Sequence, residues 1–221
     1  MNSIPTERAS SPATGKRKTR DVRWNEIIAV ATEVFYEEGY KSSSLQEIAD
    51  RLQILKGSLY YYIKSKDDLL FEVIRTTHEA GLKNITLLAA GPDDALVRLG
   101  RVVSGHVDFV CRNVKPTAVF LHELGALNAT RRLEVLGEQD AYLGVFRNLI
   151  TEAQKQGLAR TELDPGVASL AIIGSLNWIY RWFRPGGLPP DHLAETFADM
   201  AVRSLATNSA LGFPTDTQAA T

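Results

Sequence analysis

The sequence is poor in the features that mark secreted, membrane-embedded and metal-binding proteins. It has one cysteine, Cys111, which excludes an internal disulfide and a cysteine-rich zinc site. No apolar run reaches the roughly 18 residues that a membrane span needs. The longest candidate, residues 168–183, is broken by Ser175, Asn177 and Arg181. The N-terminus lacks the apolar core of a signal peptide, so we expect a cytoplasmic protein with no membrane partner.

The common signatures of enzymes are also missing. There is no His-Glu-x-x-His pattern, no Gly-x-Ser-x-Gly elbow and no glycine-rich phosphate loop. We expect Cys111 to be buried as a small hydrophobe. Four scattered histidines are each expected to be exposed or satisfied by a hydrogen bond: His78, His106, His122 and His192. The sequence therefore indicates a protein that is not an enzyme and uses no metal or cofactor.

Charge is distributed unevenly along the chain, although the net charge is only −1. In residues 1–66, Lys and Arg outnumber Asp and Glu by 11 to 8, whereas the rest of the chain has 14 against 18. The basic residues concentrate in Lys16-Arg17-Lys18 and Arg20. An excess of positive charge in one part of a chain indicates where an anionic partner such as nucleic acid would bind.

The apolar residues recur at helical spacing, without convincing alternation or repeats, so we predict an all-α protein. Residues 1–19, rich in Ser, Thr, Pro and Ala, are expected to form a disordered basic arm, and 208–221 a disordered tail. Between them we expect a head at 20–66 and a larger domain at 67–207. The predicted helices begin at Val22, Ser44, Gly57 and Ser65, and then cover residues 93–113, 117–127, 130–156, 164–184 and 190–206.

The segment from Ser43 to Tyr62 has the pattern of a helix-turn-helix. Ser44 followed by Glu47 fits a capping box at a helix start. Residues of one apolar face then recur at i, i+3, i+4 and i+7. A turn of three or four residues precedes Gly57-Ser58-Leu59-Tyr60, the spacing that places a second helix in a DNA major groove.

The stretch from Ser43 to Lys66, with Leu69 just beyond, resembles the TetR family of bacterial one-component regulators. The resemblance implies a three-helix DNA-binding head followed by a helical domain that binds an effector and dimerises. Two positions depart from the family pattern: Gln53 stands where the turn usually has glycine, and Leu55 where a small hydroxyl residue is usual. The matching positions are Ser43, Ser44, Ile48, Ala49, Lys56, Gly57, Tyr60, Tyr62, Lys66 and Leu69.

The resemblance also assigns contacts to DNA. Tyr60, Tyr62 and Lys66 would contact phosphates, while Lys56, Ser58 and Tyr61 would lie nearer the base edges. Gly57 would let the backbone approach the duplex closely, because it has no Cβ. The basic arm could lie along phosphates or be only a solvated run, and the tyrosines could instead pack in a core. The predicted DNA-binding residues are Lys18, Arg20, Ser44, Lys56, Gly57, Ser58, Tyr60, Tyr61, Tyr62 and Lys66.

The segment from Asp164 to Arg184 is apolar around its whole circumference, so it needs a partner on more than one side. A second apolar stripe follows in 190–206. Two such helices from each subunit would form a four-helix dimer interface, which the resemblance also implies; a central core helix in a monomer is the alternative. The predicted interface residues are Trp182, Phe183, Phe197, Ala201 and Leu205.

The end of this segment is similar to the Trp-aromatic-Arg-Pro-Gly-Gly ending of TetR regulators of lipid or steroid catabolism that respond to acyl-CoA thioesters. Trp178 and Trp182 would supply apolar walls, and Arg181 could bind a carboxylate or phosphate. We therefore predict a repressor that a small hydrophobic, anionic effector releases from a pseudo-palindromic operator. Three alternatives stay open: a helical enzyme or carrier, a DNA-binding scaffold without an effector, and an efflux-linked regulator that senses hydrophobic drugs.

Overall fold

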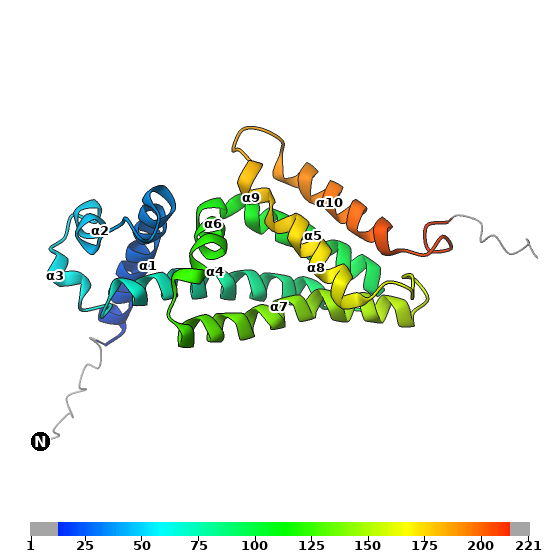
Figure 1. Cartoon of the computed structure of the whole chain (residues 1–221), viewed down its shortest axis with the longest axis horizontal. Helices are drawn as coiled ribbons and strands as arrows, with labels where there is room; N and C mark the ends of the chain where they lie inside the picture. Colours follow the sequence, from blue (N-terminus) through cyan, green and yellow to red (C-terminus); the bar gives the residue numbers. More distant parts are fainter. Residues whose placement is uncertain (1–12, 213–221) are drawn as a thin grey trace, which may run out of the picture. The chain divides into compact units, whose positions relative to one another are not determined.

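The computed structural model describes residues 13–212, with side chains from Arg20 onward. All its regular elements are helices, which confirms the all-α prediction; one isolated β-bridge joins Ala159 and Ala206. The chain forms two compact units with their boundary between Leu70 and Phe71. In order the helices are α1 (Ala13–Glu38), α2 (Leu45–Arg51), α3 (Lys56–Leu59), α4 (Lys66–Ala89), α5 (Ala95–Arg112), α6 (Val114–Glu123), the 3-10 turn η1 (Leu124–Ala126), α7 (Ala129–Lys155), α8 (Pro165–Asn177), α9 (Ile179–Trp182) and α10 (Pro190–Leu205) (Figure 1).

Three boundaries differ from those predicted. Helix α1 begins at Ala13 rather than Val22, so residues 13–19 are helical; the rest of the predicted arm, and residues 213–221 of the tail, lie outside the described residues. Pro116 does not separate helices but stands in the first turn of α6, where its missing N–H is no loss. The predicted helix 164–184 is broken at Trp178 into α8 and α9.

The first unit has its core where α1, α2 and α3 meet. Side chains of Ile27, Phe35 and Ile48 are fully or almost fully buried, as the spacing predicted. The guanidinium of Arg51 at the end of α2 donates hydrogen bonds to Glu37 and Glu38 of α1, at 2.7 and 3.1 Å. These contacts fix α2 against α1.

Other predicted helix starts and stops are confirmed at atomic detail. The Ser44 hydroxyl accepts the backbone N–H of Glu47 at 3.2 Å, and the Asp164 carboxylate accepts that of Val167 at 2.8 Å. Side chains at a helix start satisfy N–H groups that have no partner within the helix. At helix ends, Gly39 and Gly157 have φ of 77° and 71°, the left-handed conformation that glycine adopts without strain.

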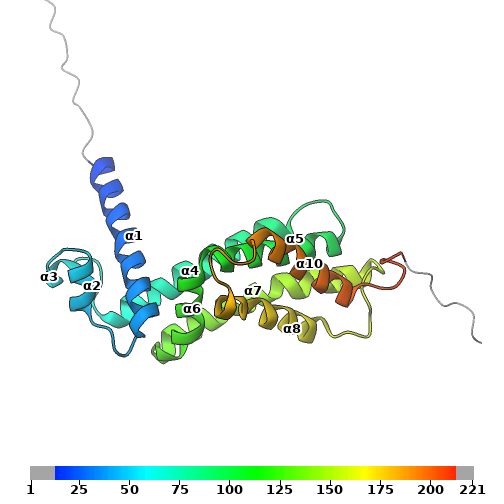
Figure 2. The ribbon, with the colours of Figure 1, turned by 90° about the horizontal axis from the view of Figure 1, so that it is seen from above.

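The second unit is organised around α5. Its apolar face is buried along most of its length, and α10, α7, α8 and α9 pack against it. Figure 2 shows α10 lying along α5. Cys111 of α5 is buried, as predicted, and burial raises the pKa of its thiol to about 11. The remaining core positions come from α7 and α8, with Phe146, Ile150 and Leu176 among the most buried.

The turn between α2 and α3 contains a strained residue at Gln53, one of the two positions that depart from the family pattern. Gln53 has φ of 55°, and it is the only described residue other than glycine with positive φ. The left-handed conformation costs a non-glycine residue about 1–2 kcal/mol. Gln53 therefore holds the turn of the helix-turn-helix at an energetic cost that glycine would avoid.

We expect Gln53→Gly to stabilise the head by about 0.5–1 kcal/mol, because glycine relieves the strain but increases the flexibility of the unfolded chain. The matched control is Gln46→Gly in α2, where the backbone is helical and glycine should cost about 1 kcal/mol. Urea denaturation, followed by Trp24 fluorescence, measures both changes. Destabilisation by Gln53→Gly would show that the turn is not strained.

Candidate nucleic-acid interface and ligand cavity

Helix α3 presents a small surface that the core of the head holds in place. Leu59 is fully buried and Ile63 is 5% exposed, and these two side chains anchor the segment from α3 onward. Leu55 precedes the helix as its N-cap residue, makes no side-chain capping bond, and is exposed. This confirms that the departure at Leu55 leaves α3 without a capping hydroxyl. The opposite side of α3 is free to meet a partner.

Gly57 lies at the surface of α3 with open space around it. A Cβ built on this residue would have no atom within 4 Å. Packing within the head therefore does not require glycine here. A requirement for close approach by a molecule outside the head explains the residue better, which is what the predicted contact with DNA needs.

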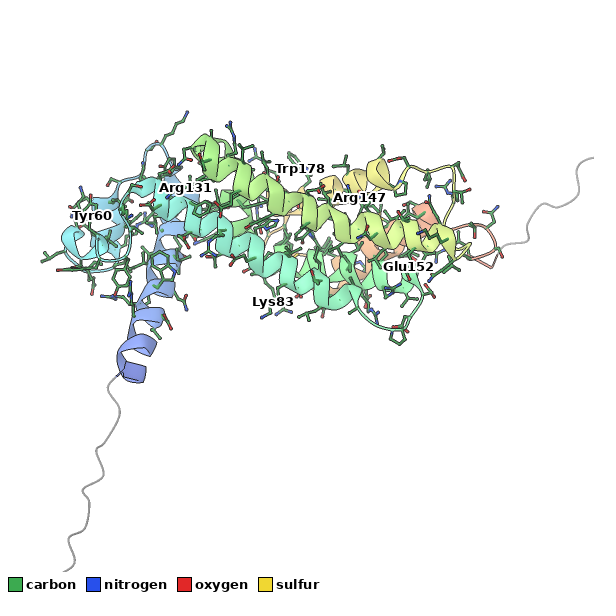
Figure 3. All side chains as sticks on the ribbon, turned by 90° about the horizontal axis from the view of Figure 1, so that it is seen from below. Tyr60, Lys83, Arg131, Arg147, Glu152 and Trp178 are labelled. Atoms are coloured by element: carbon green, nitrogen blue, oxygen red, sulfur yellow. The ribbon has the colours of Figure 1, made fainter. Side chains whose placement is uncertain are left out.

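The three tyrosines after α3 differ in their surroundings. Tyr61 is 82% exposed, and Tyr60, labelled in Figure 3, is 51% exposed. Tyr62 is half-buried, and its ring stacks on Trp24 of α1 with centroids 6.2 Å apart. Tyr60 and Tyr61 are thus available to DNA, whereas part of Tyr62 is used to hold α1 against the end of α3. Lys56 is exposed and Ser58 is half-buried.

Lys66, the first residue of α4, has a structural role that the sequence did not reveal. Its ammonium group donates hydrogen bonds to the backbone carbonyls of Tyr40 and Ser43, at 2.6 and 2.7 Å, and lies 4.4 Å from the centre of the Tyr40 ring. These carbonyls belong to the loop between α1 and α2. The geometry favours a positioning role for Lys66 over the predicted direct phosphate contact, since its donors point into the head.

The remaining predicted DNA contacts are distributed along α1 and α2. Arg20 is exposed on α1, and the side chain of Lys18 lies outside the described residues. Ser44 is exposed, but its hydroxyl is already used to cap α2. None of these residues is brought into a contact that excludes DNA, so their assignment stays a prediction.

We expect Lys66→Ala to lower the stability of the head, because the loop would lose two charge-assisted hydrogen bonds worth about 1.5 kcal/mol or more each. The slope of log K against log salt for DNA binding should stay at the wild-type value. Lys56→Ala is the control, since Lys56 is exposed on α3 and any phosphate contact it makes would contribute about 0.9 to the slope. If Lys66→Ala reduced the salt slope and left the stability of the head unchanged, Lys66 would instead contact a phosphate, as the sequence predicted.

The second unit contains a cavity of about 300 Å³. Five helices, α4 to α8, contribute to its wall, which is mostly apolar. A mostly apolar cavity with a few polar groups is the usual form of a small-molecule site. The lining residues are Thr77, His78, Gly81, His106, Phe109, Val110, Thr117, Phe120, Gln139, Tyr142, Leu143, Leu170, Ile173, Gly174 and Asn177.

His106 lies on the apolar face of α5 and is 5% exposed. Its Nδ1 is hydrogen-bonded to the hydroxyl of Tyr142 at 2.7 Å, while its Nε2 has no partner. Burial lowers the pKa of His106 to about 4, and the Asn177 side chain opposes this shift only in part. Burial also raises the pKa of the Tyr142 hydroxyl. Both side chains are therefore neutral at pH 7.

His78 of α4 stands on the same cavity. Neither ring nitrogen has a hydrogen-bond partner; Nδ1 is 3.4 Å from a carboxylate oxygen of Glu138. Burial lowers the pKa of His78 and raises that of Glu138, so each group shifts toward its neutral form. The ring packs on Phe120 and Tyr142, with centroids 5.6 Å away in each case.

These two histidines correct the sequence-based expectation, which had each histidine exposed or satisfied. His78 and His106 are buried and keep unpartnered nitrogens at the cavity, although a few polar side chains stand in its wall. The one available signal was the place of His106 among Val102, Val103 and Val107 on a helix face. Of the other two, His122 bonds to the Tyr180 hydroxyl and His192 is exposed, as expected.

The predicted effector residues lie elsewhere. Trp178, labelled in Figure 3, is 58% exposed, and Arg181 and Trp182 are exposed on α9. None of the three lines the cavity. The break at Trp178 places them beyond the end of α8, outside this cavity, so their part in effector binding stays a prediction. Trp182 instead stacks on Phe197 of α10, with ring centroids 6.4 Å apart.

The predicted dimer-interface residues differ in their surroundings, and their place in an interface stays a prediction. Phe183, Ala201 and Leu205 are buried in the core of their own unit, at 5%, 8% and 3% exposure. The buried part of the apolar stripe of α10 packs against α5 of the same chain. Trp182 and Phe197 keep partial exposure. A different face is uncovered: Val167, Leu170, Trp178 and Met200 are all more than half exposed.

Other kinds of site find no support in the described part of the chain. Residues 13–212 hold no group of three or more His, Cys, Asp or Glu side chains placed to bind a metal ion. Within the same range, no helix has both the length and the apolar character to cross a membrane.

Comparison with known proteins identifies the family. Residues 27–73 match the family described as "Bacterial regulatory proteins, tetR family", and residues 92–205 match "Tetracyclin repressor-like, C-terminal domain". The chain belongs to the tetR family of bacterial regulatory proteins. The two matched segments cover the helix-turn-helix and most of the unit that contains the cavity.

Several TetR-family relatives are similar over most of their length. The chain is 25% identical to the HTH-type transcriptional repressor KstR2 of Rhodococcus jostii over 187 residues, which cover 83% of this chain and 91% of that protein. It is 24% identical to the fatty acid metabolism regulator protein of Bacillus subtilis, over 72% of this chain and 82% of that one.

Solved TetR-family structures have the same architecture. A bacterial tetR-family regulatory protein from Rhodococcus RHA1 superposes with a TM-score of 0.78 at 26% identity, covering 82% of this chain and 96% of that one. AibR, solved in complex with isovaleryl coenzyme A and operator DNA, gives a TM-score of 0.73 at 27% identity, covering 83% and 98%. The TetR-type helix-turn-helix head and helical C-terminal domain predicted from the sequence are thus confirmed.

We expect protonation of His106 to lower the free energy of unfolding as the pH drops from about 6.5 to 4. Just above this range, His106 should make no pH-dependent contribution. The unfolded chain takes up the proton near pH 6.5, whereas the folded chain resists it until about 4. The loss should be on the order of 3 kcal/mol, with a contribution of the same sign from His78.

Urea denaturation at pH 7.5 and pH 5 measures this loss. His106→Gln, which cannot titrate, should reduce the difference between the two pH values, while His192→Gln at the exposed His192 should leave it unchanged. Equal pH dependence in wild type and His106→Gln would show that the buried imidazole does not resist protonation.

Proposed function

We propose that this chain represses transcription by binding a pseudo-palindromic operator through α3, and that a ligand in the cavity releases it. The observation that carries the proposal is the course of α4. Its first residue, Lys66, is bonded within the head, and further along the same helix Thr77, His78 and Gly81 line the cavity. A ligand that favours one position of α4 can therefore bias DNA binding, to the extent that it binds the two states differently.

An acyl-CoA thioester is our first candidate for the effector. Relatives include a fatty acid metabolism regulator, and a structural neighbour was solved with isovaleryl coenzyme A. The mostly apolar wall suits an acyl group, and a cavity of about 300 Å³ suits a short or medium chain. The CoA part is too large and too polar for this space, so it would remain at the cavity mouth in contact with solvent.

The effector proposal is tested by DNA release. Operator fragments are selected from genomic DNA, and binding is followed by fluorescence anisotropy at fixed salt. We expect CoA thioesters of short and medium chains to lower the apparent affinity for the operator at least tenfold, while free CoA has little effect. Release by a cationic hydrophobic dye, with no response to any thioester, would replace this proposal with the efflux-linked alternative. Absence of sequence-specific DNA binding would favour the enzyme or carrier alternative.

We further propose that the repressor is a homodimer whose interface includes the exposed stripe of α8. The stripe consists of Val167, which is 67% exposed, Leu170 three residues later, and Trp178 at the C-terminal end of the helix. Leu170 and Trp178 are each 58% exposed. Such a contiguous apolar face on a soluble chain is typical of a protein interface. A two-fold dimer would present two copies of α3 to two half-sites of an operator.

We expect Trp178→Glu to dissociate the dimer, because a charge without a partner would be desolvated at the interface. Leu133→Glu is the matched control: Leu133 is 68% exposed near the start of a different helix, α7. Sedimentation at low micromolar concentration should give a monomer for the first variant and a dimer for the second. A folded Trp178→Glu dimer would place the interface on another face.

A further inference from the structure

Three polar groups with unused hydrogen-bonding capacity converge on the apolar cavity. His106 Nε2 from α5, Thr117 Oγ1 from α6 and both ring nitrogens of His78 from α4 are buried and have no partner. Buried polar atoms in folded proteins nearly always have a hydrogen-bond partner. Three such groups around one cavity, on three different helices, indicate that the partner is a bound ligand.

The protonation of this cluster is set by its surroundings. Tyr142 has one hydroxyl proton, and in the described part of the chain the one hydrogen bond found for this hydroxyl is to His106 Nδ1. Donation from the hydroxyl to Nδ1 places the imidazole proton on Nε2. His106 then offers an N–H donor to the cavity, and the Thr117 hydroxyl can donate beside it or accept.

The cavity has no charge with which to bind an anion. None of its lining residues is Lys, Arg, Asp or Glu. Burial lowers the pKa of both His78 and His106, so neither is cationic at pH 7. A carboxylate placed here would be desolvated without an ion-pair partner, which is strongly unfavourable. A neutral oxygen loses much less on leaving water and can accept the two available protons.

We propose that the cavity recognises one neutral oxygen, a carbonyl or hydroxyl on an otherwise apolar ligand, between the His106 imidazole N–H and the Thr117 hydroxyl. The proposal rests on the proposed function in taking this cavity as the effector site. For a CoA thioester, the oxygen is that of the thioester carbonyl. The free acid, ionised at pH 7, is discriminated against. His78 supplies a further ring nitrogen from α4, the helix whose first residue is bonded within the head.

A pair of ligands that differ by one oxygen tests the proposal directly. Octanoyl-CoA has the thioester carbonyl, and S-octyl-CoA is the thioether without it. By isothermal titration calorimetry at pH 7.5, we expect wild type to bind the thioester about tenfold more tightly, since the thioether leaves buried donors unpaired. Equal affinities for the two ligands would overturn the proposal.

Two matched valine variants assign the discrimination to Thr117. Thr117→Val removes the unpartnered hydroxyl and should reduce the preference for the thioester to about threefold or less. Thr151→Val is the control, because Thr151 of α7 does not line the cavity and its hydroxyl already donates to the carbonyl of Arg147 at 2.9 Å. This control should keep the tenfold preference. Equal loss in both variants would show that Thr117 has no special part.

Probes without CoA separate this proposal from the proposed function. We expect 2-octanone to bind wild type at least tenfold more tightly than octanoate. Binding of 2-octanone that weakens in Thr117→Val, without binding of any thioester, would reject the acyl-CoA effector and leave the neutral-oxygen site standing. Octanoate binding as tightly as 2-octanone, or failure of both carbonyl probes to bind, would overturn the site itself.

Discussion

The burial of the apolar face of α5 is the constraint on which the second unit depends. Helices α7, α8 and α10 all pack on it, and the residues that it buries are mainly valine and leucine. A helix with neighbours on several sides cannot accept a polar side chain unless that side chain finds a partner. His106 meets this requirement only at Nδ1, and its unpartnered Nε2 lies at the cavity. The packing that stabilises the unit and the site that we assign to the effector thus share one helix.

The same helix explains why a mostly apolar cavity can still discriminate between ligands. Tyr142 is hydrogen-bonded to His106 Nδ1, and when its hydroxyl donates, the ring presents an N–H donor to the cavity. Hydrogen bonds of this kind fix the direction of a group before the ligand arrives, so less ordering is needed on binding. Two neutral residues can therefore impose a chemical preference on a wall that would otherwise accept any hydrophobic molecule of suitable size.

Much of the head could be predicted from local patterns, because capping and turn chemistry act within a few residues. The predicted local features are found at Ser44, which caps α2, and at Gly39, which ends α1 with positive φ. The turn also has positive φ at Gln53, where glycine is usual. The stripe of α10 was read correctly as apolar, but periodicity does not say whether the partner is a second subunit or α5 of the same chain. The position of the predicted effector residues outside the cavity has a related cause: helical periodicity continued through Trp178, where the helix breaks. The sequence did not reveal the unpartnered Nε2 of His106, because hydrogen bonding of a buried side chain depends on neighbours that are distant in the sequence.

The hydrogen bonds of Lys66 have a consequence for how the repressor could be switched. Its ammonium joins the first turn of α4 to the loop that leads into α2, through two carbonyls on one short segment. Any rotation of that turn must carry the loop with it or break both bonds at once. The first turn of α4 and this loop therefore move together. Any flexibility that weakens the response to ligand has to lie elsewhere along α4. Substitutions at Lys66 would then separate ligand binding from DNA binding. The repressor would still form its cavity and bind its ligand, but the ligand would no longer change its affinity for DNA.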